Sequence, residues 1–467
     1  MIDLALAEIA AIVGGTLAPT ADPSMVVGGS VQTDSRLARP GSLFFALPGE
    51  ETDGHLFAEA AVANGATLVI AERPVAVDAA VILVDNGVAA LADLAREVVA
   101  RVRRKGNLTV IAVTGSNGKT TTKNLLRAIL SAQSPTIAPE GSFNNHVGAP
   151  ISMLRIDYQT RYLVVEMGAS HGGEIAHLVS VARPDIGIVL KVGLAHVGEF
   201  GGVDAIQRAK SEMVVDLPST ATAILNADDS RVAQMAAMTA AAVRWFGRSD
   251  AAEVRAEHIV AGVAGTSFDL VVGERRLPVS LRILGEHHVM NALAALTAAR
   301  ELGIDLAQAI SAIEAMPRAE RWRMEVLASP SGAVIINDAY NASPDSTRAA
   351  LSTLAHLGGG DVRSIAILGE MTELGESADD EHTAIGRLVA ALGVEELIVV
   401  GAGARHIHTA ASLTSGWRGQ SFFVDSADLA HELLRDELQA GDLVLVKSSK
   451  SAGLRFLGDR LAGVDQT

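Results

Sequence analysis

The sequence predicts an α/β protein of three consecutive domains with mainly parallel sheets. Short runs rich in Val and Ile alternate with stretches of helical periodicity along most of the chain, which is the pattern of βαβ units. The alternation is broken at residues 254–284, where short alternating runs between glycine turns predict an antiparallel flap or edge. A chain of 467 residues has room for roughly two to four domains of ordinary size.

Composition and charge exclude several classes of protein. A hydrophobic content of 49% with 20% charged residues predicts real cores rather than disorder. A net charge of −16 argues against non-specific nucleic-acid binding, because no basic face is available to displace counterions. The absence of cysteine excludes disulfides, thiolate catalysis and Cys-ligated zinc.

The N-terminal stretch is apolar and resembles the central part of a secretory signal. However, Asp3 and Glu8 interrupt it, and the first basic residue is Arg36, so we expect a short helix capped by Asp3 and ended by Gly14. No run approaches the length of a transmembrane helix, which predicts a cytoplasmic protein without a membrane span.

The first predicted domain covers residues 1–105 and is a small α/β unit. We expect helices near residues 55–64 and 88–104 and strands at residues 26–33, 42–47, 67–71 and 81–84. Two polar clusters, residues 33–36 and 53–55, could bind a phosphate or a sugar. Solvated turns with local Asx-type hydrogen bonds explain both clusters equally well.

The second and third predicted domains cover residues 106–318 and 319–467. The second has expected strands at residues 108–113, 162–167, 185–192 and 222–226, the flap, and a helix at residues 286–302. The third repeats the strand–helix alternation in a Rossmann-like manner. Its expected strands lie at residues 333–337, 364–368, 396–400, 421–424 and 443–446.

The second domain opens with a strand, a glycine turn and a helix, which is the geometry of a phosphate loop. Free backbone N–H groups at the start of such a helix bind an anion, Lys119 can reach the outer phosphates, and the Thr120 hydroxyl can ligate Mg²⁺. The strict motif has glycine where this chain has Val113, and an ordinary turn that happens to carry lysine is the alternative. We interpret the segment as a nucleoside triphosphate site in a P-loop ATPase domain. Its loop residues are Gly115, Ser116, Asn117, Gly118, Lys119, Thr120 and Thr121.

Polar side chains follow the expected strands of this domain at their carboxyl ends, where open parallel sheets bind ligands. Glu166 ends one strand and is a hard oxygen ligand suited to Mg²⁺, and His196 follows the next. Asn226, Asp228 and Asp229 follow the strand at residues 222–226. Each alone could be a loop residue or a helix cap, but together they predict a site at this edge.

Lys210 interrupts an apolar helical stripe formed by Val203, Ile206, Met213 and Leu217. A buried ammonium group is costly without a partner. The lysine either extends its charged end to the surface or turns toward the metal and phosphate site, and we favour the second.

Further candidates lie later in the chain. Arg323, between the second and third domains, could pair with a phosphate across a cleft. Asn291 lies on the helix at residues 286–302, Asp338 and Tyr340 follow a strand, and Lys447 and Lys450 flank a hydroxyl-rich loop.

Several strings of the sequence resemble the Mur ligase family, the ATP-dependent amide-forming enzymes of peptidoglycan precursor synthesis. TGSNGKT, VVEMGA, LAHVGEF, RAKSE, NADD and HHVMNALAA occur in the family's order, over about residues 30 to 455. EMGASHGGEI, GSFNNHVGAP, NDAYNASPDS, ILGEMTELGE and VLVKSSKSAGL are similar to strings of the subgroup that joins D-Ala-D-Ala to UDP-N-acetylmuramoyl-tripeptide. Two strings depart from the usual KGSR and HNVxN patterns, as KSSK and HHVMN.

The resemblance implies a UDP-substrate-binding first domain, a central ATP-binding domain and a C-terminal ligase domain. It implies ATP and two Mg²⁺ ions, one held by Thr120 and Glu166 and a second held with the help of His196, and a carbamylated Lys210 near the metals. Asn291 would contact adenine, with Arg323 and Asp338 approaching the nucleotide from the hinge and the third domain. Ser35 and Arg36 would lie near the UDP of the substrate, and Asn144 and Asn145 near its muramoyl-peptide part. The catalytic set implied is Lys119, His196, Lys210, Arg323 and Asp338.

The expected reaction passes through an acyl phosphate, formed when a substrate carboxylate attacks ATP and consumed by the amine of D-Ala-D-Ala. The expected partners are UDP-MurNAc-tripeptide and D-Ala-D-Ala, without nucleic acid, and we expect a monomer. Three alternatives stay open. They are another Mur ligase or a folylpolyglutamate synthase-like ligase, a nucleotide-gated binding module, and a simple P-loop hydrolase that releases phosphate without a carboxylate substrate.

Overall fold

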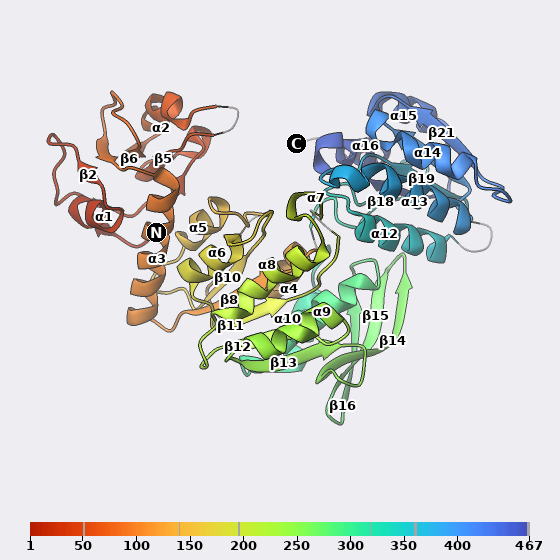
Figure 1. Cartoon of the computed structure of the whole chain (residues 1–467), viewed down its shortest axis with the longest axis horizontal. Coiled ribbons are helices and arrows are strands. Elements are labelled where there is room, and N and C mark those ends of the chain that lie inside the picture. The colour runs from red at the N-terminus through yellow and green to blue at the C-terminus, as the bar shows by residue number, and fades with distance from the viewer. Residues whose placement is uncertain (50–51, 140, 195–196, 319, 359–361, 465–467) are drawn as a thin grey trace.

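Three α/β bodies follow one another along the chain in the computed structural model, which describes residues 1–49, 52–139, 141–194, 197–318, 320–358 and 362–464 (Figure 1). Their sheets have five, nine and six strands, and a two-stranded sheet accompanies the first. The predicted α/β class with three sheets is confirmed. The first and third bodies lie apart from each other, on the same side of the central one (Figure 1). Within the described residues, no helix is both long and apolar enough to cross a membrane.

The N-terminal body contains the five-stranded sheet β2-β7-β6-β5-β4, in which only β2 is antiparallel to its neighbour. Its strands are β1 (Leu4–Ala5), β2 (Thr16–Leu17), β3 (Val26–Val27), β4 (Val31–Gln32), β5 (Ser42–Ala46), β6 (Ala66–Ala71) and β7 (Ala80–Leu83). Its helices are α1 (Leu6–Ile12), α2 (Ala58–Ala63) and α3 (Gly87–Lys105), with 3₁₀ turns η1 (Ser35–Leu37) and η2 (Gly54–Phe57).

Two expectations for this body were wrong. The single strand expected at residues 26–33 is two short strands in different sheets, because the chain turns at Gly29, where a Cβ atom would lie 2.0 Å from the Gly41 carbonyl oxygen. The N-cap of α1 is Ala5 rather than Asp3, because Leu4 and Ala5 pair with Val27 and Val26 before the helix begins.

The central body has strand order β16-β15-β14-β13-β12-β11-β8-β10-β9, parallel from β9 to β14 and antiparallel in the flap, as predicted. Strands β9 and β13 were not predicted. The strands are β8 (Thr109–Thr114), β9 (Thr136–Ile137), β10 (Tyr162–Glu166), β11 (Ile186–Val189), β12 (Thr222–Asn226), β13 (Ala242–Gly247), β14 (Val254–Gly262), β15 (Gly265–Val272) and β16 (Arg275–Leu281). The helices are α4 (Lys119–Ser131), α5 (Gly148–Met153), α6 (Glu174–Ala182), α7 (Val197–Phe200), α8 (Val203–Val215), α9 (Ser230–Gln234), α10 (His287–Glu301) and α11 (Leu306–Glu314), with the 3₁₀ turn η3 (Met235–Met238).

The register around β8 decides where the polar strand ends meet. Residues 110–113 are fully buried, as their Val and Ile side chains predict for a strand covered on both faces. Glu166 of β10 is opposite Val113, and Val189 of β11 is opposite Thr114. The carboxyl ends of three neighbouring strands therefore lie side by side with the loop that follows β8.

The C-terminal body has strand order β17-β18-β22-β19-β20-β21, with β17 antiparallel and the others parallel. The edge strand β17 was not predicted, because its four residues include Glu325 and lie directly after the connection from the central body. The strands are β17 (Glu325–Ala328), β18 (Val334–Asn337), β19 (Ser364–Leu368), β20 (Glu396–Val400), β21 (Gln420–Val424) and β22 (Leu443–Lys447). The helices are α12 (Pro344–Leu357), α13 (Ala378–Ala391), α14 (Arg405–Ser412), α15 (Ala427–Leu434) and α16 (Leu454–Leu461), with 3₁₀ turns η4 (Gly375–Ser377), η5 (Ala402–Ala404) and η6 (Lys450–Ala452).

Helix α3 connects the first two bodies. It packs on β5 of the first sheet and on α5 and α6 of the central body, and its buried residues belong to one apolar cluster with both. At its end, Arg103 donates to Asp185 Oδ2 at 2.8 Å, and the same oxygen accepts from the Val110 N–H group. One helix therefore contributes to the cores of both bodies. The domain boundaries predicted at residues 105–106 and 318–319 stay predictions.

Replacing Leu94, a fully buried residue of α3, should destabilise both bodies together. We expect Leu94→Ala to cost about 2–5 kcal/mol through lost burial and a residual cavity. The control is Arg104→Ala, at an exposed position on the same helix, with an expected change within about 0.5 kcal/mol. Calorimetric unfolding should show the loss for Leu94→Ala alone, and equal melting temperatures would contradict the shared core.

Candidate active site

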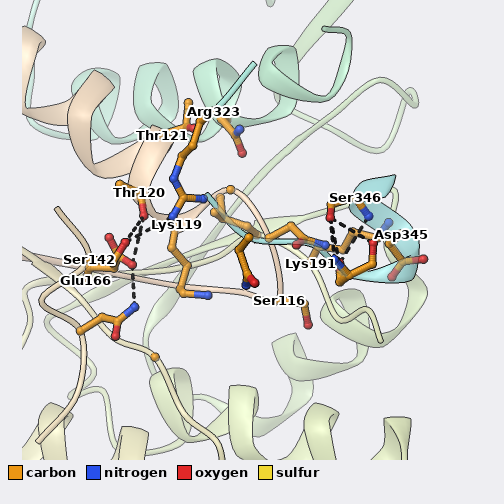
Figure 2. Close-up of a pocket in the computed structure, with 18 of the residues that line it drawn as sticks. Ser116, Lys119, Thr120, Thr121, Ser142, Glu166, Lys191, Arg323, Asp345 and Ser346 are labelled. Atoms are coloured by element: carbon orange, nitrogen blue, oxygen red, sulfur yellow. Dashed lines mark hydrogen bonds between the residues drawn. The ribbon is translucent and has the colours of Figure 1, made fainter. Parts of the chain in front are cut away.

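A cavity of about 560 Å³ lies where the carboxyl edge of the central sheet faces the C-terminal body (Figure 2). Residues from the loop after β8, the end of β10 and the start of α10 form its central-body wall. The opposite wall comes from the segment around Arg323 and the loops after β18 and β22. The cavity therefore exists only because two bodies meet.

The loop after β8 has the geometry of an anion cradle. Gly118 adopts a left-handed φ of 86°, and a Cβ atom there would lie 2.2 Å from Asn291 Oδ1, so glycine is required. Helix α4 then begins at Lys119 without a side-chain cap, which leaves its first N–H groups available to an anion. Lys119 Nζ donates to the Gly115 carbonyl oxygen at 2.7 Å, within the loop. Ser116 exchanges hydrogen bonds with Gly193 beyond β11, at 2.9 and 3.2 Å, which holds the loop against the neighbouring strand end.

Glu166 is the buried acidic group of this cavity. Its Oε1 atom accepts from Asn144 Nδ2 at 2.8 Å and from Thr120 Oγ1 at 3.3 Å (Figure 2). Its Oε2 atom is buried and has no hydrogen-bond partner among the described residues. An orphaned carboxylate oxygen beside a hydroxyl fits a hard cation such as Mg²⁺.

His196, predicted to ligate a second metal ion, lies outside the described residues. Within the described part of the chain, no cluster of three or more His, Asp or Glu side chains could hold a metal ion. The predicted metal set of Thr120, Glu166, His196 and Lys210 therefore stays a prediction.

Lys210 is buried in α8, with only 2% of its surface exposed, so the alternative that it reaches the surface is wrong. Its Nζ atom lies 5.8 Å from the centre of the Phe200 ring. Burial, reinforced by the positive charge of Lys119, lowers the pKa of Lys210 to about 7, although Glu174 and Glu212 oppose the shift. Lys210 is not part of the cavity wall, although the charge of Lys119 in the phosphate loop contributes to lowering its pKa.

Asn291 and two histidines form the wall at the start of α10. Asn291 is buried, and its Nδ2 atom lies 3.2 Å from His288 Nδ1, which acts as the acceptor because an amide nitrogen only donates. The rings of His287 and His288 are 4.1 Å apart. Burial lowers the pKa of His287 to about 4 and that of His288 well below its ordinary value, so both rings are neutral near pH 7.

The C-terminal body contacts the central one through Arg323 and Asp345 at the cavity, and through η4 against α7 outside it, where the Gly198 N–H group donates to the Glu373 carbonyl oxygen at 3.3 Å. The Arg323 guanidinium lies 4.2 Å from the centre of the Tyr340 ring and donates to Ser142 Oγ at 3.3 Å (Figure 2). Asp345, in the first turn of α12, accepts from the Leu194 N–H group at 3.0 Å. Asp338 forms an ion pair with the buried Lys447 at 2.5 Å. Both residues line the cavity.

The structure brings most of the candidate residues to this cavity and leaves a few elsewhere. Ser35 and Arg36 lie in η1 of the first body, where the Arg36 side chain is 86% exposed and pairs with Asp34. Asp228 and Asp229 accept from backbone N–H groups of neighbouring turns rather than facing the cavity. The candidates that line it are Ser116, Asn117, Gly118, Lys119, Thr120, Thr121, Asn144, Asn145, Glu166, Asn226, Asn291, Arg323, Asp338, Tyr340 and Lys447.

The cluster at residues 53–55 is an internal support. Asp53 accepts from the backbone and ring nitrogens of His55 and pairs with Arg73, and the N–H group of Glu72 donates to His55 Nε2. These contacts hold the pKa of Asp53 far below its usual value. The polar groups of Asp53 and His55 are occupied within the body, which favours the turn interpretation.

Sequence reasoning missed several wall residues. Lys191 lies two residues after the end of β11, so the strand-end argument that identified Glu166 could have found it. Ser142, Asp345 and Ser346 gave no such signal, because they belong to a loop or to a helix start. The two histidines His287 and His288 were noted only as a departure from a familiar string.

Comparison with known proteins covers nearly the whole chain. Models of the Mur ligase family catalytic domain, the Mur ligase middle domain, and the Mur ligase glutamate ligase domain match residues 29–104, 113–299 and 322–450. The UDP-N-acetylmuramoyl-tripeptide–D-alanyl-D-alanine ligase of Mycobacterium tuberculosis is 42% identical, over 100% of this chain and 99% of the relative. MurF from Acinetobacter baumannii has a similar structure, with a TM-score of 0.88 and 30% identity over 99% of both chains. MurF ligase from Thermotoga maritima, solved in complex with ADP, matches with a TM-score of 0.81 and 27% identity over 93% of this chain and 97% of that one.

Removing the ammonium group of the loop should weaken binding of a nucleoside triphosphate. We expect Lys119→Met to lower affinity for a non-hydrolysable ATP analogue by about 10²-fold, because one cation beside the phosphates is lost. The fold should be kept, since Lys119 is the first residue of α4 and belongs to no apolar core cluster. Calorimetric titration measures the affinity, with the exposed Lys450→Met as the control. Affinity within about twofold of the parent would contradict the phosphate-loop assignment.

Proposed function

The chain belongs to the Mur ligase family, and we propose that it is the ATP-dependent ligase that joins D-Ala-D-Ala to UDP-N-acetylmuramoyl-tripeptide. The observation that carries the proposal is the extent of the likeness to ligases of that name, 42% identity over the whole chain. Another Mur ligase or a folylpolyglutamate synthase-like enzyme would share the central body and differ in the first and third. Here the likeness includes all three, which favours the D-Ala-D-Ala-adding activity.

The central body binds and orients ATP in this proposal. The N–H groups at the start of α4 and the Lys119 ammonium hold the phosphates, and Asn291 contacts adenine. Thr120 and Glu166 would hold one Mg²⁺ ion, and His196 would help to hold a second. When bound, Mg²⁺ offsets the repulsion between a substrate carboxylate and the triphosphate.

The reaction then proceeds in two steps. The carboxylate of the tripeptide attacks the γ-phosphoryl group, which gives ADP and an acyl phosphate, and the amine of D-Ala-D-Ala displaces phosphate from the acyl carbon. Arg323 supplies a positive charge from the hinge while Asp338 approaches the nucleotide from the third body. Because both belong to the wall that the C-terminal body contributes, closure of that body excludes water from the acyl phosphate.

The remaining candidate residues are proposed to bind the UDP-linked substrate. The exposed Arg36 and its neighbour Ser35 would contact UDP on the first body. Asn144 and Asn145 would contact the muramoyl-peptide part, which agrees with the 2.8 Å contact between Asn144 and the proposed metal ligand Glu166. We further propose that the enzyme acts as a monomer in the cytoplasm, where ATP is available.

Lys210 is proposed to be carbamylated. A lysine with a pKa of about 7 has a large neutral fraction at physiological pH, and a neutral amine reacts with CO₂. The carbamate replaces a buried positive charge with an anion whose oxygens suit Mg²⁺. This change of sign explains why a lysine occupies the inward stripe of α8, beside the positive Lys119.

Phosphate release tests the proposed function. With ATP, UDP-MurNAc-tripeptide and D-Ala-D-Ala all present, the chain should form the amide and release one phosphate per bond. A simple P-loop hydrolase would release phosphate without the carboxylate substrate, and a nucleotide-gated binding module would release none. Amide formation with a different amino-acid acceptor in place of D-Ala-D-Ala would contradict the proposal in favour of another ligase.

The extent of carbamylation should increase with pH, because only the deprotonated amine of Lys210 reacts with CO₂. Its neutral form predominates above the pKa of about 7, so after CO₂ depletion bicarbonate should restore activity at about pH 8 far better than at about pH 6. Carbon-13 NMR with labelled bicarbonate should show a carbamate signal that Lys210→Arg lacks and that the control Lys450→Arg retains. A signal that survives in Lys210→Arg would place the carbamate elsewhere.

A further inference from the structure

Lys123 is a second lysine on α4, one turn after Lys119, and the mechanism above gives it no role. Its side chain is completely buried, which is rare for lysine. Residues three and four positions apart share a helix face, and side chains lean toward the start of the helix. Lys123 therefore extends beneath Lys119 and Thr120, toward the phosphate site.

The Lys123 ammonium group binds two main-chain oxygens, those of Pro139 and Gly141. Its Nζ atom donates to the Pro139 carbonyl oxygen at 2.8 Å and to the Gly141 carbonyl oxygen at 2.9 Å. Glu166 and Glu320 supply the negative potential that opposes the cost of burying this charge, and burial still lowers the lysine's pKa. The Lys123 side chain is thus held by hydrogen bonds to two particular acceptors, and not by apolar packing alone.

The turn that Lys123 binds leads directly to groups of the active site. Ser142 Oγ lies 3.1 Å from Thr120 Oγ1 and accepts from Arg323 at 3.3 Å. Asn144 donates to Glu166 at 2.8 Å. Ser142 and Asn144 thus contact two of the proposed Mg²⁺ ligands, Thr120 and Glu166.

Most of the contacts that hold residues 141–145 are made beyond Gly141. Gly141, Phe143 and Asn145 are exposed, Ser142 and Asn144 are half-buried, and no strand or helix includes them. At its far end the Gly168 N–H group donates to the Asn144 carbonyl oxygen at 2.8 Å. Asn145 Oδ1 also accepts from the Val147 and Gly148 N–H groups at that end. The two bonds from Lys123 fix the near end of the segment, at Pro139 and Gly141.

We propose that Lys123 is a positioning residue for the metal–nucleotide site, an inference that rests on the proposed function. Its ammonium group holds the turn through Pro139 and Gly141, so that Ser142 and Asn144 keep the Thr120 hydroxyl and the Glu166 carboxylate aligned for Mg²⁺. Lys123 does not touch the nucleotide or the metal ion. It acts through the turn, as outer-shell groups act on metal ligands elsewhere.

The test compares nucleotide binding with and without Mg²⁺. Lys123→Met keeps the length of the side chain and removes both hydrogen bonds. We expect it to weaken calorimetric binding of a non-hydrolysable ATP analogue by about 10–100-fold in the presence of Mg²⁺. In EDTA, where the alignment of metal ligands is irrelevant, its affinity should stay within about threefold of the parent.

A matched control separates positioning from loss of stability. Ile129→Ala removes a fully buried side chain from the same helix without touching the turn, so it should lower the melting temperature without a Mg²⁺-selective effect. A double-mutant cycle adds a second readout. If Lys123 acts through Ser142, then Ser142→Ala should change Mg²⁺-dependent binding by less than about twofold in the Lys123→Met background.

The outcomes are distinct. Equal weakening with and without Mg²⁺, or a profile like that of Ile129→Ala, would overturn the positioning role and leave the lysine purely structural. Full additivity with Ser142→Ala would overturn the route through the turn. If the parent chain itself showed no Mg²⁺-dependent binding, the metal site of the proposed function would fail and the inference with it.

Discussion

The buried carboxylate of Glu166 is the constraint on which the rest of the site depends. A carboxylate buried at the end of a strand is expensive to desolvate, and among the described residues only one of the Glu166 oxygens has hydrogen-bond partners, Thr120 and Asn144. Its position follows from backbone pairing, because β10 sits next to β8 with Glu166 opposite Val113. The phosphate loop and the acidic group are thus held together by sheet hydrogen bonds, before any ligand is present.

The charged residues around Glu166 are positive, whereas the molecule as a whole is negative. The chain carries a net charge of −16, yet Lys119, Lys123 and Arg323 surround this one carboxylate. Such a concentration of positive groups suits a triphosphate and would be self-repelling without one. It also explains why Lys210, a further cation beside Lys119, is better accommodated in a form that has lost its positive charge.

The cavity is a property of two bodies rather than one. Arg323 and Asp345 cross from the C-terminal side to Ser142 and Leu194, while the first body is connected mainly through α3. Outside the cavity, α7 packs on η4 and Leu284 joins the apolar cluster of the C-terminal body, so the two bodies enclose the cavity between them. A reaction with a water-sensitive acyl phosphate benefits from such an arrangement.

Local sequence patterns predicted the elements and the residues attached directly to them. The run at residues 108–113, followed by glycines and Lys119, predicted strand, loop and helix because each depends on neighbours in sequence. The same holds for Glu166 at a strand end, and for Lys210, whose place in an apolar stripe of α8 predicted burial. The errors were also local: a strand was extended through Gly29, where the close approach of Gly41 forces a turn.

The sequence by itself therefore determined the phosphate loop, the strand–helix alternation of the longer elements, and the inward face of α8. Only the tertiary structure decided that Ser142 meets both Thr120 and Arg323, and that Lys123 serves a turn rather than the surface. The physical reason is that periodicity reports which face of an element is buried, whereas contacts between distant loops depend on how whole sheets and bodies pack. No pattern within the turn at residues 141–145 contains that information.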